Sequence, residues 1–200
     1  MKLKPPTMKP YAGRRSREYL YEDEVQRMFV ATKKHGEFGN RNATLIWLMY
    51  IHGLRSSEAR ALRWSNVDFS RKQFFVKRVK NGKDTTHPLT DYEVTLLERL
   101  HPLKPGAPEW VFTKKDGEPL GRSTVYKIIR EAGKRAGLEI DAHPHMLRHA
   151  CGYHLINERG IDIRRVQEYL GHRDIKHTVI YTELDANKFN NLWEDGTDTT

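Results

Sequence analysis

Residues His143 to Leu184 read HPHMLRHACGYHLINERGIDIRRVQEYLGHRDIKHTVIYTEL, and this stretch concentrates the chemically informative side chains of the chain. It places His145 three residues before Arg148, and it continues with a Leu-Gly-His turn at His172 and with Tyr181. Arginine forks bind phosphate oxygens bidentately, histidine moves protons near neutral pH, and tyrosine can form a covalent intermediate. The stretch therefore predicts a site that attacks a DNA phosphate with a protein hydroxyl.

A second informative piece, Gly53-Leu54-Arg55-Ser56-Ser57-Glu58, lies far upstream. Arg55 and Glu58 are three residues apart at the start of a predicted helix, so they share a face and the carboxylate can orient the guanidinium. Taken alone, this pair is better interpreted as a surface ion pair. The same spacing recurs in His145 and Arg148, which favours one shared site. Two arginines can hold the two non-bridging oxygens of a phosphate and stabilise the charge of its transition state.

These motifs resemble those of the tyrosine recombinase (phage integrase) family, over about residues 20–193. In that family an arginine after Gly-Leu is followed three residues later by an acid, as Arg55 is by Glu58. A His-x-Leu-Arg-His box matches residues 145–149, and a Leu-Gly-His turn followed by a tyrosine matches His172 and Tyr181. The phrases THPL, HPHMLRH and YLGHRDIKHTVIYT are most similar to the small enterobacterial Fim-type members, which invert a promoter segment that controls fimbriae.

The family also carries a lysine on a β-hairpin, eight residues before a Pro-Leu or similar pair, and counting back from Pro88 gives Lys80. Lys80 directly precedes Asn81-Gly82, a turn signal, so it can reach out from the hairpin tip and protonate the leaving 5′-oxygen. Thr85 and Thr86 stand where many relatives carry an arginine, which departs from the family pattern.

The resemblance implies a transesterification. Tyr181 would attack the phosphate, form a 3′-phosphotyrosine and free a 5′-hydroxyl, and the covalent bond would conserve the energy needed for rejoining. No cofactor is therefore expected. The reference pKa of tyrosine is about 10, so the hydroxyl needs activation by an arginine-rich pocket or a base. The implied catalytic residues are Arg55, Lys80, His145, Arg148, His172 and Tyr181, with Glu58 in support.

The histidines invite comparison with a metal site. His145 and His149 have the spacing of zinc-binding helices, but Met146 breaks the His-Glu-x-x-His pattern. The single cysteine, Cys151, leaves no Cys pair and is expected to be a small buried helix residue. We therefore predict no metal site and a structural role for His149.

The charge of the chain points to a polyanionic partner, because the net charge is +9 and the sequence pI is about 9.6. Lys127, Arg130, Lys134 and Arg135 recur at helical steps and are candidate DNA contacts, with a solvated helix face as an equal alternative. Arg14 and Arg15 belong to a basic segment that is free of acids, which either tracks DNA or is a solvated tail.

The expected fold class is mainly α with a small antiparallel β-sheet (α+β), the tyrosine recombinase catalytic-domain fold. We expect a basic flexible arm over residues 1–17, the catalytic domain over 18–193 and an acidic tail over 194–200. Ser56 or Ser57 should cap one helix, Ser123 another, and Thr90 with Glu93 a third. The predicted helices are 22–34, 42–51, 56–62, 90–100, 123–136, 145–158, 163–170 and 185–193, and the predicted strands are 73–79 and 85–89.

Several features bound the location and architecture of the protein. The sequence has no long apolar run that predicts a transmembrane helix and no secretory signal, and its single cysteine fits a reducing cytosol. We expect a cytoplasmic, nucleoid-associated bacterial protein. Only about 20 residues precede the first predicted helix, so the separate DNA-clamping domain of many relatives is not expected.

Together these observations predict a site-specific DNA recombinase that inverts a promoter segment in fimbrial phase variation. The expected partners are double-stranded DNA with inverted-repeat sites, other protomers in a tetramer on DNA, DNA-bending accessory proteins, and no membrane. The alternatives are an integrase or excisionase of a mobile element, a DNA-binding regulator without catalysis, and a type IB topoisomerase-like enzyme. The apolar residues of the predicted helix 185–193 can dock either on their own core or on a neighbouring protomer.

Overall fold

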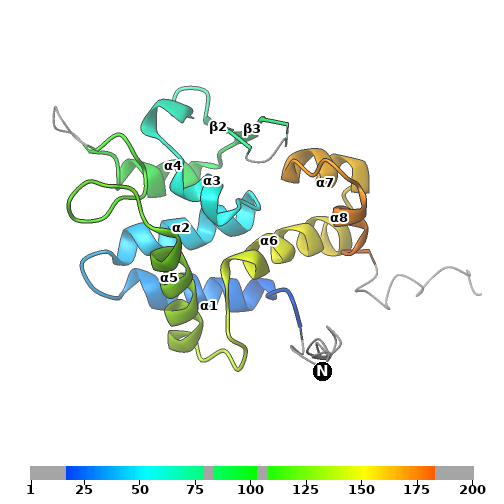
Figure 1. Cartoon of the computed structure of the whole chain (residues 1–200), viewed down its shortest axis with the longest axis horizontal. Helices are drawn as coiled ribbons and strands as arrows, with labels where there is room; N and C mark the ends of the chain where they lie inside the picture. The colour runs from blue at the N-terminus through cyan, green and yellow to red at the C-terminus, as the bar shows by residue number, and fades with distance from the viewer. Residues whose placement is uncertain (1–16, 79–82, 103–107, 183–200) are drawn as a thin grey trace, which may run out of the picture.

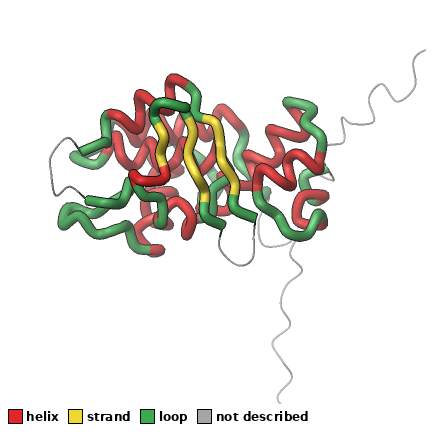
Figure 2. The backbone as a smooth tube through the Cα atoms, turned by 90° about the horizontal axis from the view of Figure 1, so that it is seen from above, coloured by secondary structure: helices red, strands yellow, loops and turns green. Residues whose placement is uncertain are grey.

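The computed structural model describes residues 17–78, 83–102 and 108–182 of the chain (Figure 1). Helices dominate, and one antiparallel sheet of three strands lies on one side of the helical body in the order β1-β2-β3 (Figure 2). The expected fold class is confirmed. No helix among the described residues is both long and apolar enough to cross a membrane.

The helices follow the predicted order with small shifts of their ends. The α-helices are α1 (Glu22–Lys33), α2 (Gly39–Ile51), α3 (Ser56–Arg60), α4 (Asp91–Glu98), α5 (Arg122–Arg135), α6 (Pro144–Tyr153), α7 (Ile163–Leu170) and α8 (Lys176–Val179). A 3-10 turn, η2 (Trp64–Asn66), precedes the sheet, and a π-helical segment, η3 (His154–Glu158), extends α6. The strands are β1 (Val67–Asp68), β2 (Gln73–Val76) and β3 (Thr85–Pro88).

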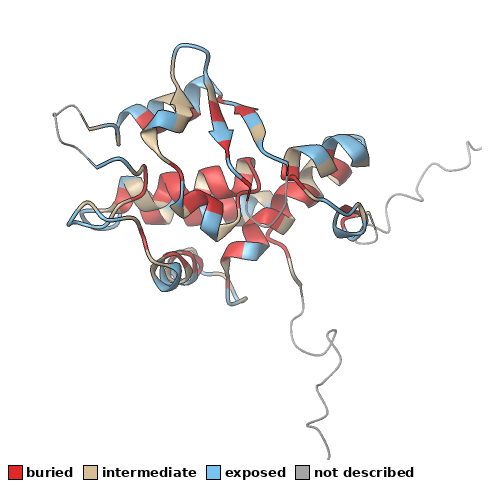
Figure 3. Cartoon of the chain, turned by 45° about the horizontal axis from the view of Figure 1, so that its top comes forward, coloured by how far each residue is buried: buried red, intermediate tan, exposed pale blue. Residues whose placement is uncertain are grey.

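The main core forms around α2, whose run of apolar residues is buried on several sides. Leu45, Ile46, Leu48 and Met49 are all fully buried, and α1, α4 and α6 pack against this helix. Figure 3 shows the buried residues concentrated along the central helices, with exposed residues at the periphery. Apolar burial of this kind is the main source of stability in a helical domain, and it fixes the two helices that carry the site, α3 and α6.

A second, smaller cluster holds the C-terminal part of the described chain. Its buried members are Cys151, Ile156, Val166, Leu170 and Tyr181, and they join η3, α7 and the segment after α8. In Figure 1 this unit lies at the far end of α6, next to β3. Cys151 is buried, as predicted, and its thiol donates to the carbonyl of Ile51 at 3.3 Å.

Two predicted helix caps are wrong. The N-cap of α3 is Arg55, because the Glu58 carboxylate accepts the Arg55 backbone N–H at 2.8 Å and so fixes the helix start before Ser56. Gly121, in an extended conformation, occupies the N-cap of α5 in place of Ser123. Thr90 and Glu93 do form the predicted capping box of α4, with the Thr90 N–H donating to Glu93 at 2.8 Å.

Other differences concern the lengths of elements. The helix predicted over 145–158 begins at Pro144, which suits the first helical turn, and its last part is π-helical. Helix α2 begins three residues before the predicted start at Asn42, and the short elements β1 and α8 were not predicted. The predicted turn at Asn81-Gly82, the helix 185–193 and the tail 194–200 lie outside the described residues, as does all of the arm 1–17 except Arg17.

Candidate active site

The centre of the candidate site is the carboxylate of Glu58, whose side chain is fully buried. One of its oxygens accepts a hydrogen bond from Arg55 Nη1 at 2.7 Å, and the other accepts one from Arg78 Nη1 at 2.7 Å. Arg148 Nη1 lies 3.9 Å from the second oxygen. Burial alone would raise the pKa of Glu58, but the charge of Arg78, the backbone N–H of Arg55 and the charge of Arg148 hold it below its usual value. The ionised carboxylate therefore sets the positions of three guanidinium groups.

Arg148 is anchored by the ends of two other segments. Its Nη1 donates to the carbonyl of Gly53 at 2.5 Å, and its Nη2 donates to the carbonyl of Leu170 at 2.7 Å. Burial, followed by the charge of Arg55, lowers the pKa of Arg148 to about 10, so it stays cationic at neutral pH. The pairing of Arg55 with Glu58 and the placing of Arg148 beside it confirm that the two motifs meet in space.

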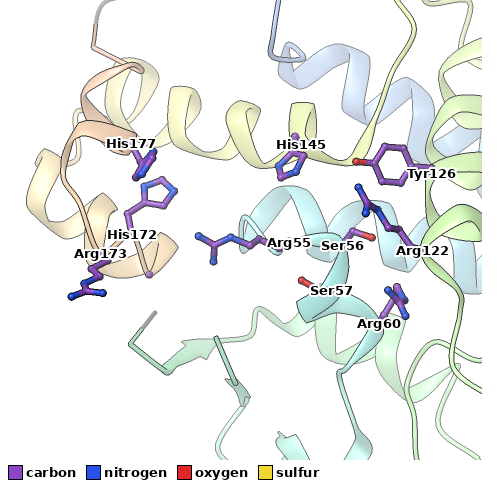
Figure 4. Close-up of a pocket in the computed structure, with 11 residues that line it drawn as sticks. Arg55, Ser56, Ser57, Arg60, Arg122, Tyr126, His145, His172, Arg173 and His177 are labelled. Carbon is purple, nitrogen blue, oxygen red and sulfur yellow. The ribbon is translucent and has the colours of Figure 1, made fainter. Parts of the chain in front are cut away.

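A pocket of about 530 Å³ opens over Arg55, His145 and His172 (Figure 4). The loop before α3 supplies Arg55, the first turn of α6 supplies His145, and the turn after α7 supplies His172. That last turn needs Gly171, which has a φ of +64° and approaches Arg78 so closely that an added Cβ would lie 2.7 Å from Arg78 Nε. The fold thus assembles the pocket from three segments that are distant in sequence.

The imidazoles of His145 and His172 are neutral bases. Burial, together with the charges of Arg148 and Arg55, lowers the pKa of His145. Burial, followed by the same two charges, lowers the pKa of His172 to about 3. His172 is oriented by a hydrogen bond of 2.8 Å between its Nδ1 and Thr178 Oγ1. Neutral imidazoles beside arginines can accept a proton or bond to a phosphate.

Tyr181 lies beside this pocket but does not line it. Its side chain is only 1% exposed, and its ring packs on Gly152 so tightly that a Cβ added to Gly152 would lie 2.3 Å from it. The ring also contacts His149 and His172, with ring centroids 5.6 and 6.4 Å away. Burial raises the pKa of Tyr181 to about 12, against the charges of Arg148 and Arg55. The structure therefore holds this tyrosine as a neutral, buried phenol.

His149 lies beside Tyr181, and its structural role stays a prediction. Burial, followed by the charges of His145 and Arg148, lowers its pKa to about 4, and its ring packs against Tyr181. Outside the pocket, the described residues bring Glu22, His154 and Glu158 close enough to hold a metal ion. No sequence motif marks this group, because Glu22 is distant in the chain from the other two.

The remaining predicted site residues are placed only in part. Lys80, Arg14 and Arg15 lie outside the described residues. Lys127, Arg130 and Lys134 are exposed on α5, as both of the sequence interpretations require. Arg130 pairs with Asp141 at 3.0 Å and Lys134 with Glu131 at 3.4 Å, and their contact with DNA stays a prediction.

Sequence reasoning missed Arg78, although its side chain is fully buried against Glu58. Arg78 Nη2 donates to the carbonyl of Tyr169 at 2.6 Å and lies 3.1 Å from His87 Nε2. A buried chain continues from His87 to His52 at 3.3 Å and from His52 to Glu93 at 2.8 Å. A signal was present, because Phe74, Val76 and Arg78 alternate along one strand and period-two alternation places them on the same, inward face.

A comparison with known proteins places this arrangement in a family. The model of the phage integrase family matches residues 18–188, and the chain belongs to that family, the tyrosine recombinases. The type 1 fimbriae regulatory proteins FimB and FimE of Escherichia coli K12 are similar to it. FimB is 42% identical over 191 residues, which cover 94% of each chain. FimE is 44% identical over 183 residues, which cover 89% of this chain and 91% of FimE.

The fold has solved counterparts in the same family. The XerH site-specific recombinase bound to its difH substrate, in a pre-cleavage complex, superposes with a TM-score of 0.72 and 25% identity. The match covers 90% of this chain and 53% of the XerH chain. The chain is thus a tyrosine recombinase by family and by fold.

Proposed function

We propose that this protein is a site-specific recombinase that cuts and rejoins double-stranded DNA through Tyr181 and inverts a promoter segment controlling fimbriae. The observation that carries the proposal is the group of Arg55 and Arg148 around the buried carboxylate of Glu58, beside Tyr181. Similarity to FimB and FimE over most of their lengths supports the fimbrial role.

The chemistry follows from the positions of these groups. The scissile phosphate enters the pocket, and Arg55 and Arg148 bind its non-bridging oxygens and stabilise the charge that develops on them. The Tyr181 oxygen attacks phosphorus while its proton passes to the neutral imidazole of His145, and His172 donates a hydrogen bond to the phosphate. The bond from phosphorus to the 5′-oxygen breaks, and that oxygen takes a proton from Lys80. Rejoining is the reverse, so the energy of the phosphodiester is retained.

The buried state of Tyr181 adds a step before this chemistry. A phenol whose pKa is about 12 and whose ring is 1% exposed cannot attack a phosphate in the pocket until its surroundings move. The C-terminal unit that contains α7 and α8 is the part whose movement would expose it. Binding of DNA or of a second protomer could supply the free energy for that shift.

The assembly and location are parts of the same proposal. Inversion cuts four strands, so four protomers act together on two inverted-repeat sites, with accessory proteins that bend the DNA. Residues 18–193 form the catalytic domain. Arg14 and Arg15 of the N-terminal arm, and Lys127, Arg130 and Lys134 of α5, contact the DNA backbone. The protein works in the bacterial cytoplasm, where the chromosome lies.

The test uses inverted repeats found in the genome beside the gene. A nicked suicide substrate built from one repeat should yield a covalent adduct with the protein, and Tyr181→Phe should bind the same DNA without forming the adduct. A plasmid that carries a segment between two repeats should show inversion. A wild-type protein that binds the repeats without any adduct would support the regulator in place of the recombinase. Excision, or relaxation alone, would support a mobile-element enzyme or a topoisomerase.

A further inference from the structure

The pocket over Arg55 is larger and more basic than one phosphate requires. Its lining includes four arginines and three histidines and no carboxylate. Glu58, the acid next to it, is fully buried and already occupied by the surrounding arginines. In Figure 4 the arginine and histidine side chains extend well to either side of Arg55 and His145, with His172, Arg173 and His177 at one end. A row of this kind suits successive phosphates of one strand.

The opposite end of the pocket has the features of a second anion site. Arg60 and Arg122 converge there, and neither has an ion-pair partner among residues 17–78, 83–102 and 108–182. Arg60 Nε donates to the carbonyl of Leu120 at 2.6 Å, which fixes the guanidinium and leaves its two terminal nitrogens for a ligand. Arg122 lies over the ring of Tyr126, with its Cζ 5.7 Å from the ring centroid.

A polar atom in the same corner lacks a partner. Ser56 Oγ is buried and makes no hydrogen bond within the described part of the chain. In Figure 4 this hydroxyl points toward Arg122, between α3 and the start of α5. Leaving a buried hydroxyl unsatisfied is costly, as is placing two guanidinium groups side by side without an anion. One bound phosphate would relieve both.

We propose that Arg60, Arg122 and Ser56, with Tyr126 supporting Arg122, form a second phosphate site for the backbone phosphate adjacent to the scissile one on the same strand. The inference rests on the proposed function. The second phosphate site would set the register of the DNA strand, because a contact to a neighbouring phosphate fixes which phosphodiester lies between Arg55 and His145. The site would also hold the cut strand while the covalent intermediate exists.

The test measures binding rather than cleavage, so its outcome does not depend on the recombinase reaction. Tyr181→Phe serves as the background, and binding to a single half-site is measured against salt concentration. Removing one phosphate contact should lower the slope of log K against log salt by about 1. We expect this for Arg122→Ala. Arg99→Ala is the matched control, since Arg99 is exposed at the C-terminal end of α4 and does not line the pocket. It should change the slope much less.

Half-sites with a single neutral methylphosphonate then locate the contact. One at a phosphate adjacent to the scissile position should weaken binding of the background protein by about tenfold. The same replacement should add almost nothing in Arg122→Ala, because both changes remove the same contact. The second site is wrong if the affinity losses from Arg122→Ala and from the methylphosphonate multiply at both phosphates adjacent to the scissile one. It is also wrong if Arg122→Ala binds the unmodified half-site with the affinity and salt dependence of the background protein. A wild-type protein that shows this overlap but forms no covalent adduct would overturn the proposed function alone.

Discussion

The two parts of the active site are held in place by different kinds of interaction. Arg55, Arg78 and Arg148 are fixed by hydrogen bonds to Glu58 and to backbone carbonyls. Tyr181 is fixed by packing in a small apolar cluster, and its hydroxyl has no hydrogen-bond partner among the described residues. The arginine group around Glu58 is therefore preorganised in the free protein, and Tyr181, the proposed nucleophile, is held buried.

The contrast has a physical reason. Transition-state stabilisation requires fixed charges that cost no reorganisation when the reaction occurs, and a buried carboxylate with several donors supplies that rigidity. A small cluster with few buried contacts opens at a lower free energy than the main core, so it suits a part that must move. A recombinase that kept its tyrosine exposed would be able to cut DNA before the partners have assembled.

The largest effect is expected from Tyr181→Phe. It should abolish covalent attachment, because only the hydroxyl is lost, while the ring still fills the space next to Gly152. Thermal unfolding should change little, since the hydroxyl has no bonding partner within the described structure. Adduct formation on gels and calorimetry measure the two quantities. An adduct in the variant would identify a different nucleophile.

Substitutions of Arg55 and Arg148 should have similar effects on the cleavage rate but different effects on the free energy of unfolding. Arg55→Ala and Arg148→Ala should each slow cleavage by about a hundredfold or more at saturating protein. Arg148→Ala should also lose more unfolding free energy than Arg55→Ala, on the order of 3–5 kcal/mol, because it leaves the buried carbonyls of Gly53 and Leu170 unpaired. The side chain of Arg55 is 29% exposed and that of Arg148 is 4% exposed, which is the basis of this difference. Rates within a few fold of wild type would refute the assignment of either arginine.

Acid should lower the free energy of unfolding through the buried histidine His87. Burial lowers the pKa of His87 from 6.5 to about 2, so below pH 6.5 the unfolded chain binds a proton that the folded chain does not. Stability is therefore complete above about pH 6.5 and falls as the pH decreases, by on the order of 3 kcal/mol at about pH 4 from this group alone. Urea unfolding at several pH values measures the slope. His87→Gln should make that slope shallower, and an unchanged slope would show that other groups cause it.

The residues of the proposed site can be located from short sequence motifs, whereas the burial of Tyr181 cannot. Arg55, Glu58, His145 and Arg148 could be found because short motifs carry them, and each motif keeps its spacing on a helix. Arg78 was missed because its only signal is the period-two alternation with Phe74 and Val76, which indicates burial but does not show that Arg78 pairs with Glu58. The burial of Tyr181 was also beyond reach, because it depends on Gly152 and on the packing of α7, both of which are tertiary features.

The smallest effect is expected from chelation. Arg55 and Arg148 supply the positive charge that a metal ion provides in other phosphoryl-transfer sites, so cleavage should keep its rate in excess EDTA. The group of Glu22, His154 and Glu158 is the place where a bound metal ion could make this prediction wrong. His154 Nδ1 lies 2.6 Å from Glu158 and 3.7 Å from Glu22. If EDTA slows cleavage of the wild type but not of Glu22→Ala, a metal ion bound by Glu22, His154 and Glu158 supports cleavage from outside the pocket. If sensitivity persists in that variant, a metal acts in the phosphate pocket itself, and the two arginines do not suffice for catalysis.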